Sequence, residues 1–342
     1  LCVGVGGVAL PWSCVLCWSA WAGVGKGRPA LCAAVEAIAG VCGSTASMLT
    51  AQFLATDSLL LGADADLQAR ILPDAAAGKS LGAFARTEPQ AGSNPADMRT
   101  TAKREGEGYR IKGTKCFISN AGAADFIVVY AKTDPEAGSK GITAFLIEKS
   151  MKGFSTSKHF DKLGMRGSNT ADLIFEDCEV PFENILGEEG KGVRVLMSGL
   201  DYERVVLAGI GLGIMAACLD EIMPYMAERK QFGQRIGDFQ LMQGKMADMY
   251  TAMNSARAYV YSVAQACDRG DVTRQDAAAC CLYASEQAMV QAPQAVPAMG
   301  GAAYLSDHPV GRTLRDDAPT ESGAGREESP ATGCARRMRL HC

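Results

Sequence analysis

The spacing of apolar residues divides the chain into a helical stretch, a β stretch and a second helical stretch. Between residues 34 and 74, apolar positions recur every three or four residues, and Pro73 is expected to close this stretch. From 81 to about 186, short runs of β-branched and aromatic residues alternate with Gly and Asp, which is typical of strands joined by turns. Helical spacing returns from 192 to about 299.

This order predicts the α+β class with three modules. We expect an incomplete N-terminal helical domain over residues 1–80, whose start is atypical or truncated. A middle β domain should cover 81–190, and a C-terminal helical bundle should cover 191–315. Residues 316–342 are rich in Gly, Ser, Pro, Glu and Arg, so they are predicted to form an atypical, disordered tail.

Composition narrows the class of protein and of partner. Hydrophobic residues make up 48% of the 342 residues and charged residues 21%, as in a globular protein. The net charge of −4 gives no general attraction to nucleic acid or anionic membranes, so neither is expected as a partner. Leu1–Gly25 carries no charge and is long enough for a membrane span, but Pro11 and the lack of basic residues before it favour an altered N-terminus.

The 13 cysteines are scattered. Cys14 and Cys17 form the one C-x-x-C, and only His159, His308 and His341 could join a metal site. No paired C-x-x-C stands at zinc-finger distance, so no metal is expected and the thiols should be free in a reducing compartment.

Two loop segments offer groups for a ligand. Around Thr87 a strand gives way to a Gly-containing loop whose hydroxyls and amides could hold a phosphate or a polar cofactor edge. Phe117 stands near the small hydroxyl residue Ser119 and could cover a planar ring. From composition alone, an ordinary turn and a strand end with a core Phe explain the two segments better.

Three helical segments carry further candidates. Glu203 lies in a largely apolar stretch, where a carboxylate facing an apolar cavity becomes a stronger base; the alternative is a solvated pair with Arg204. Arg229 could bind a pyrophosphate, or belong to an ordinary interhelical loop. Gly209-Ile-Gly-Leu-Gly does not follow a strand, so a close helix–helix contact explains it better than a dinucleotide site.

In combination, these segments resemble the acyl-CoA dehydrogenase family over residues 41–315. The strings that carry the resemblance are Thr87-Glu-Pro-Gln-Ala-Gly-Ser, Phe117-Ile-Ser-Asn, Lys162-Leu-Gly-Met-Arg-Gly-Ser-Asn-Thr, Phe175-Glu-Asp-Cys-Glu-Val-Pro, Arg229-Lys-Gln-Phe-Gly and Arg312-Thr-Leu-Arg-Asp. Within the family, Val195–Arg204 and Phe239–Tyr250 look like the isovaleryl-CoA dehydrogenase type. The resemblance implies that the middle domain is a β-barrel between two helical domains.

The resemblance also assigns the catalytic base. Most members carry it late in the chain, where this sequence has Ala324 in Glu321-Ser-Gly-Ala-Gly. Isovaleryl-type enzymes carry it in the earlier helix, at the position of Glu203. The implied reaction is FAD-dependent α,β-dehydrogenation of a short branched acyl-CoA (isovaleryl-CoA to 3-methylcrotonyl-CoA, in leucine catabolism). Glu203 would take the α-proton while the β-hydrogen leaves as hydride to flavin N5.

The remaining site residues follow from the same resemblance. The implied FAD contacts are Phe84, Thr87, Gly92, Ser93, Phe117, Ile118, Ser119, Arg229, Phe232, Gln240, Gly300 and Gly301. The implied substrate contacts are Ser93, Ser139, Lys140, Asp201, Tyr202, Arg204, Ala324 and Gly325. Implied partners are the acyl-CoA, an electron-transfer flavoprotein and further copies in a homotetramer (a dimer of dimers). The implied compartment is the mitochondrial matrix in a eukaryote and the cytoplasm in a bacterium.

Some positions depart from the family pattern. Pro297 and Ala302-Ala303 interrupt a Gln-x-Phe-Gly-Gly-x-Gly stretch that helps to bind FAD, and Arg326-Glu-Glu replaces the expected Thr-Ser-Glu. These changes leave open the question of whether the chain binds FAD firmly. Two alternatives therefore remain: a short-chain or 2-methyl-branched acyl-CoA dehydrogenase, and a non-catalytic family member that acts as an interaction module.

Overall fold

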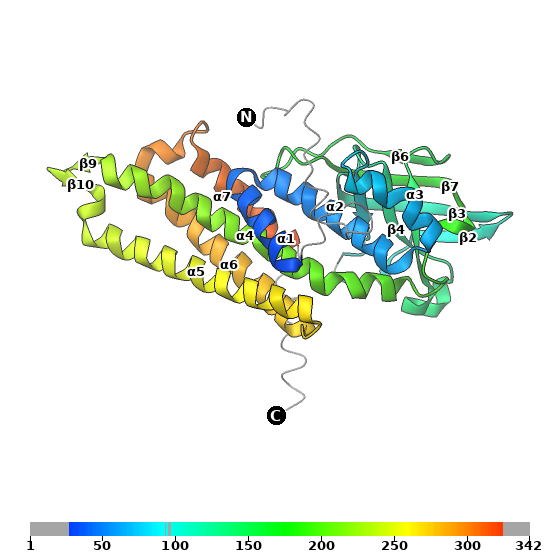
Figure 1. Cartoon of the computed structure of the whole chain (residues 1–342). Helices are drawn as coiled ribbons and strands as arrows, with labels where there is room; N and C mark the ends of the chain where they lie inside the picture. Colours follow the sequence, from blue (N-terminus) through cyan, green and yellow to red (C-terminus); the bar gives the residue numbers. More distant parts are fainter. Residues whose placement is uncertain (1–26, 93, 95–96, 324–342) are drawn as a thin grey trace. The chain divides into compact units, whose positions relative to one another are not determined.

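The computed structural model describes residues 27–92, 94 and 97–323 (Figure 1). These residues fall into two compact units, each described here by itself. Within the described ranges, the first unit comprises 47–92, 94, 97–161 and 167–203, and the second comprises 27–46, 162–166 and 204–323. Residues 27–46 thus group with the C-terminal helices, whereas the sequence pattern joined them to the stretch that follows.

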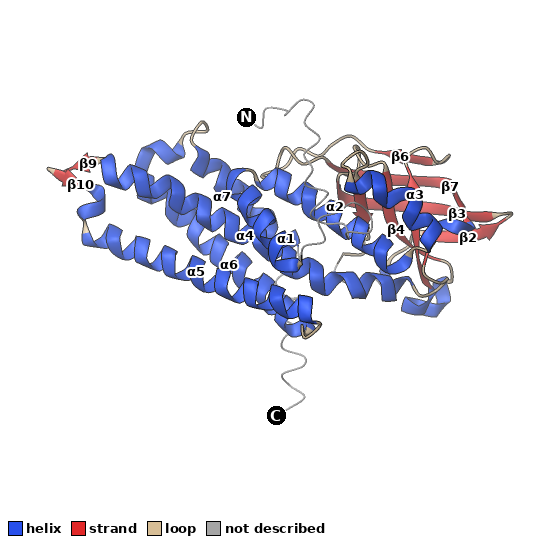
Figure 2. Ribbon diagram, in the orientation of Figure 1, coloured by secondary structure: helices blue, strands red, loops and turns tan. Residues whose placement is uncertain are grey.

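The first unit is built on one eight-stranded sheet, drawn in red in Figure 2. Its strands run in the order β6-β7-β3-β2-β4-β5-β8, and β1 pairs with β4 beside that path. Their bounds are β1 Gly82–Ala85, β2 Thr101–Glu105, β3 Gly108–Ser119, β4 Phe126–Lys132, β5 Ile142–Glu148, β6 Phe154–Thr156, β7 Thr170–Pro181 and β8 Ile185–Leu186. The predicted β domain is therefore present.

The sheet is open, which corrects the prediction of a barrel. The strands at the two ends of the path, β6 and β8, have three and two residues and pair with β7 and β5. Strands this short offer too few backbone groups for a ladder that would join the two ends. The sheet instead branches at β4, because β1 and β2 both pair with this strand in parallel.

Strand β4 is buried on both faces, and its side chains alternate between two clusters. Phe126, Val128 and Tyr130 pack into one cluster with residues of α2 (Gly43–Gly62) and α3 (Ala65–Ala76). Ile127 and Val129 pack into the other cluster, among side chains of the sheet itself. Two covered faces explain why this strand reads as a continuous apolar run.

Helix α3 begins at a capping residue, because the side chain of Asp64 accepts a hydrogen bond from the Leu67 backbone N–H at 2.8 Å. Pro73 lies inside this helix and does not close it. The helix continues because the loss of one backbone donor near its end is offset by the burial of Leu72, Ala75 and Ala76.

The second unit consists of helices and one short hairpin (Figure 2). Helix α5 packs against α1 and α6, and α6 packs against α7. Their bounds are α1 Arg28–Val41, α4 Gly192–Glu228, α5 Gln240–Arg269, α6 Arg274–Met299 and α7 Pro309–Gly323, with the hairpin strands β9 Lys230–Gln231 and β10 Gln234–Arg235. Residues 316–323 are therefore helical, which corrects the predicted tail over that part.

The glycines of α4 permit a close helix contact, as predicted. A Cβ on Gly213 would collide with the carbonyl oxygen of Glu36 and lie 2.6 Å from the Cβ of Ala39. Helix α4 is long and apolar enough to cross a membrane, but 72% of its most apolar window is buried in the protein. That burial is typical of a core helix.

Candidate active site

Glu203 continues the apolar face of α4. Leu196 lies seven residues before it and Leu200 three, so all three project from one side of the helix. Leu196 is buried in the cluster that contains Phe126 and Tyr130, and Leu200 packs against that cluster. Glu203 itself is half-buried. The helix therefore carries this carboxylate along its core-facing side.

The phenol of Tyr130 lies close enough to Glu203 to sense its charge. Burial raises the pKa of Tyr130, and the negative charges of Glu203 and Asp57 raise it further. Asp57 is buried, and its Oδ2 lies 3.4 Å from where a Cβ on Gly199 would stand, one turn before Glu203. The Phe84 ring packs on Tyr130 with centroids 5.4 Å apart. Sequence patterns had not marked Asp57 and Tyr130.

Phe117 is presented to solvent by strained backbone. Its φ is 60°, and the β3–β7 register shifts between Lys115 and Ile118. The side chain is 68% exposed, which excludes the core Phe considered from composition. Ile118 is buried, whereas Ser119 is half-buried beside it. A non-glycine residue held in this conformation is a device for aiming a side chain, here an aromatic ring next to a hydroxyl.

Asn120 fixes the end of β3. Its side chain is fully buried, and its Nδ2 donates to the carbonyls of Met48 and Gly82, each at 3.1 Å. Its backbone N–H donates to Asn169 at 2.7 Å. The turn after Phe117 is thereby tied to α2 and β1.

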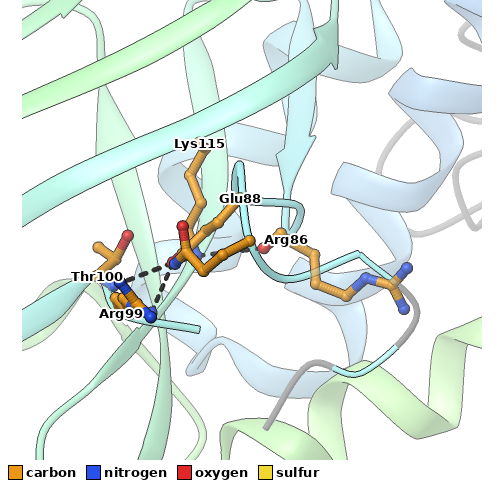
Figure 3. Close-up of polar contacts among 6 residues, drawn as sticks. Arg86, Glu88, Arg99, Thr100 and Lys115 are labelled. Carbon is orange, nitrogen blue, oxygen red and sulfur yellow. Dashed lines mark hydrogen bonds and ion pairs between the residues drawn. The ribbon is translucent and has the colours of Figure 1, made fainter. Parts of the chain in front are cut away.

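A buried ion pair joins the Thr87 loop to β3 (Figure 3). The Nζ of Lys115 lies 2.7 Å from Oε1 of Glu88, and the side chains are 0% and 2% exposed. Lys115 also donates to the Arg86 carbonyl at 3.3 Å. The Glu88 carboxylate further accepts from the backbone N–H of Arg99 and Thr100 and from the Gln90 side chain.

The Glu88 carboxylate is held in its charged form. Burial alone would raise its pKa, but the charge of Lys115 and the hydrogen bonds from Arg99, Lys115 and Thr100 outweigh burial and hold the pKa below its usual range. Burial lowers the pKa of Lys115, and the charge of Glu88 offsets part of that effect. We take the pair as ionised at neutral pH because four donors surround the carboxylate.

Comparison with known proteins identifies the family of the chain. Residues 83–178 match the family profile "Acyl-CoA dehydrogenase, middle domain", and residues 190–338 match "Acyl-CoA dehydrogenase, C-terminal domain". The isovaleryl-CoA dehydrogenase, mitochondrial, of Arabidopsis thaliana is 50% identical over 309 residues, which cover 90% of this chain and 76% of that protein. The chain belongs to the acyl-CoA dehydrogenase family.

Two further relatives support the assignment. A 2-methylacyl-CoA dehydrogenase, mitochondrial, of Solanum tuberosum is 49% identical over 298 residues, covering 87% of this chain and 72% of that one. The structure of butyryl-CoA dehydrogenase from Megasphaera elsdenii superimposes with a TM-score of 0.94 at 34% identity, covering 97% of this chain and 88% of that one. As a family member, the chain is an FAD-dependent oxidoreductase that acts on acyl-CoA.

The first unit offers groups that fit FAD. Thr87 is half-buried, Gly92 is exposed with open space around it, and Phe117 and Ser119 stand at the end of β3. Its predicted substrate residues divide: Asp201 and Tyr202 share one turn of α4 with Glu203, whereas Ser139 and Lys140 are exposed on a 3-10 segment, Pro135–Gly141. Arg204 is the next residue of α4, and the second unit resumes there.

The second unit carries the other predicted FAD residues, which are all exposed. Phe232 stands at the tip of the β9–β10 hairpin with φ of 53° and 94% exposure, and Arg229 and Gln240 flank the hairpin. Gly300 has φ of 63°, and neither it nor Gly301 has any atom near where a Cβ would stand. Ser93, Ala324 and Gly325 lie outside the described residues.

Proposed function

We propose that the chain oxidises isovaleryl-CoA to 3-methylcrotonyl-CoA, a step of leucine catabolism, with Glu203 as the base. The position of Glu203 on the core-facing side of α4 carries the proposal. Two sequence features support it. Ala324 stands where most members carry their base, and Val195–Arg204 looks like the isovaleryl type. The identity to the Arabidopsis thaliana isovaleryl-CoA dehydrogenase points the same way.

In this proposal the side chains of α4 create the basic site. Glu203 accepts the α-proton of the thioester, and the apolar side chains before it on the helix keep water from the carboxylate, which strengthens it as a base. Thr87, Phe117 and Ser119 hold the flavin. FAD, when bound, supplies the hydride acceptor for the β-carbon. Asp201, Tyr202 and Arg204 bind the CoA ester together with Ser139 and Lys140.

The partners in the proposal follow the family. Electrons pass to an electron-transfer flavoprotein, and the chain assembles as a homotetramer in which Arg229, Phe232 and Gln240 contact the FAD of an adjoining subunit. The exposure of all three residues on a helix–hairpin–helix segment supports this arrangement. For a eukaryotic source we propose the mitochondrial matrix, because the Arabidopsis thaliana relative is named mitochondrial.

The test begins with flavin absorption of the purified protein and its bleaching by isovaleryl-CoA under anaerobic conditions. Glu203→Gln should slow bleaching by about 10²–10⁴-fold, the usual contribution of a general base, while flavin content stays unchanged. Glu221→Gln is the matched control, because it makes the same change on α4 about 27 Å further along the helix. Full activity of Glu203→Gln would remove Glu203 from this role.

A second substrate is favoured by the Solanum tuberosum relative, which is named a 2-methylacyl-CoA dehydrogenase. The same bleaching assay with isovaleryl-, 2-methylbutyryl- and butyryl-CoA separates the candidates. We expect the highest kcat/KM with isovaleryl-CoA. If 2-methylbutyryl- or butyryl-CoA is turned over faster, that acyl-CoA becomes the proposed substrate in place of isovaleryl-CoA. The proposed role of Glu203 would not be affected.

A further inference from the structure

The buried pair of Glu88 and Lys115 lies between the two segments that the proposed FAD contacts occupy. Glu88 directly follows Thr87, and Lys115 comes two residues before Phe117. The backbone N–H of Cys116 also donates to the carbonyl of Thr87 at 2.9 Å. The ion pair (Figure 3) and this hydrogen bond together fix the separation of the Thr87 loop from the end of β3.

The same carboxylate closes the loop that contains Gly92. Glu88 accepts from the N–H of Arg99 at 2.6 Å and from that of Thr100 at 3.1 Å, on the far side of the loop. Glu88 and Ala91 also exchange backbone hydrogen bonds at 3.0 and 3.1 Å. One side chain therefore sets both ends of the loop and its distance from β3.

Stability alone does not account for an ion pair at this place. Two charges taken out of water lose solvation that their mutual attraction barely recovers, and well-packed apolar side chains often serve stability as well or better. An ion pair with fixed hydrogen-bond directions instead selects one backbone geometry. At 0% and 2% exposure, Lys115 and Glu88 are too deep to touch a ligand themselves.

We infer that Glu88 and Lys115 are positioning residues for FAD, which act by holding Thr87, Phe117 and Ser119 in one fixed arrangement. The inference rests on the proposed FAD contacts of those three residues. It does not depend on which acyl-CoA is the substrate or on the role of Glu203.

The test compares Glu88→Gln with Glu36→Gln. Glu36 also forms an ion pair, 2.6 Å from Arg257, but between helices of the second unit and at side-chain exposures of 13% and 34%. FAD affinity of the apoprotein is measured by flavin titration well below the melting temperature, and thermal melting of the apoprotein is recorded separately. We expect both variants to melt lower, but only Glu88→Gln to weaken FAD binding, by tenfold or more, with a shifted flavin absorption band. An FAD affinity of Glu88→Gln within twofold of wild type would overturn the inference.

Hydrogen exchange of the apoprotein gives a readout that needs no cofactor. In Glu88→Gln, the amides of Arg99, Thr100 and Cys116 should exchange at least tenfold faster, while those of the β4–β5 ladder keep their protection. Unchanged exchange at these three amides in Glu88→Gln would overturn the inference. Wild-type apoprotein that takes up no FAD would overturn it too, whereas tight FAD binding without isovaleryl-CoA oxidation would refute only the proposed substrate.

Discussion

The two units fill their cores in opposite ways. The sheet of the first unit buries large side chains, among them Phe126, Tyr130, Phe145 and Phe175. The buried residues of α6 in the second unit are mostly Ala, Cys and Ser, and the glycines of α4 let backbone touch backbone. The sheet therefore depends on large buried side chains, whereas the close helix contacts of α4 and α6 depend on small residues. The free energy of unfolding should therefore fall when a large side chain is removed from the sheet, and when a methyl group is added at a close helix contact.

The largest expected effect is the loss of a large side chain from the sheet. Phe145→Ala should lower the free energy of unfolding by about 3–5 kcal/mol, because Phe145 is fully buried and its ring packs edge-on to Tyr109 at 5.1 Å. Urea unfolding measures this change. Tyr304→Ala in the second unit, where the ring is 88% exposed, is the control and should change the value by about 0.5 kcal/mol or less. Equal losses in both variants would contradict the comparison.

The converse substitution tests the helical unit. Gly213→Ala should cost about 1–3 kcal/mol, because the added methyl meets the Glu36 carbonyl, which is backbone and cannot rotate away. Circular dichroism during urea unfolding measures the loss. A stability equal to wild type would show that α1 moves aside freely and that the close contact is not required.

Each unit also holds a buried carboxyl whose pKa is shifted, and the two shifts have opposite directions. The pKa of Glu88 lies below its usual value of 4.5, so its stabilisation is full above pH 4.5 and is lost as pH falls through the folded pKa. Burial raises the pKa of Asp316 above 3.8 despite the hydrogen bond from Met165, so its contribution is full below pH 3.8 and is lost as pH rises through the folded pKa.

Substitution at these carboxyls should therefore change the pH profile in opposite directions. Between pH 3 and 7, Glu88→Gln should flatten the rise of unfolding free energy with pH, and Asp316→Asn should remove a fall. Each unit of pKa difference corresponds to about 1.4 kcal/mol. Denaturant unfolding at a series of pH values measures both profiles. Parallel profiles for the two variants would contradict the assigned signs.

The smallest expected effect is a gain in the helical unit. Gly244 lies inside α5 with no atom near where a Cβ would stand, so Gly244→Ala should stabilise the protein by about 0.5–1 kcal/mol. The same substitution at Gly213 should destabilise the protein. Thermal melts of the two variants therefore test whether the effect of Gly→Ala depends on the space around the added methyl group. A loss at Gly244 would mean that the open space is needed in the assembled protein.

The sequence predicted features that repeat along the chain. Period-two runs located the sheet, and the apolar stretch around Glu203 located α4. Features that arise between distant residues were missed: Glu88 and Lys115 are 27 positions apart, and nothing local marks either as buried. The exposure of Phe117 depends on an irregularity between two strands, and the open edge of the sheet depends on strand lengths. Such features are set by tertiary packing, which local patterns do not record.

Within the described residues, the chain passes from one unit to the other at residues 46/47, 161/162, 166/167 and 203/204. Two of these crossings fall inside helices, α2 and α4. No single cut in the gene would therefore release either unit intact, and a cut at Glu203 would leave a turn of α4 with unpaired carbonyls. A single recombination event at any of these crossings would divide the second unit, and would exchange neither unit whole.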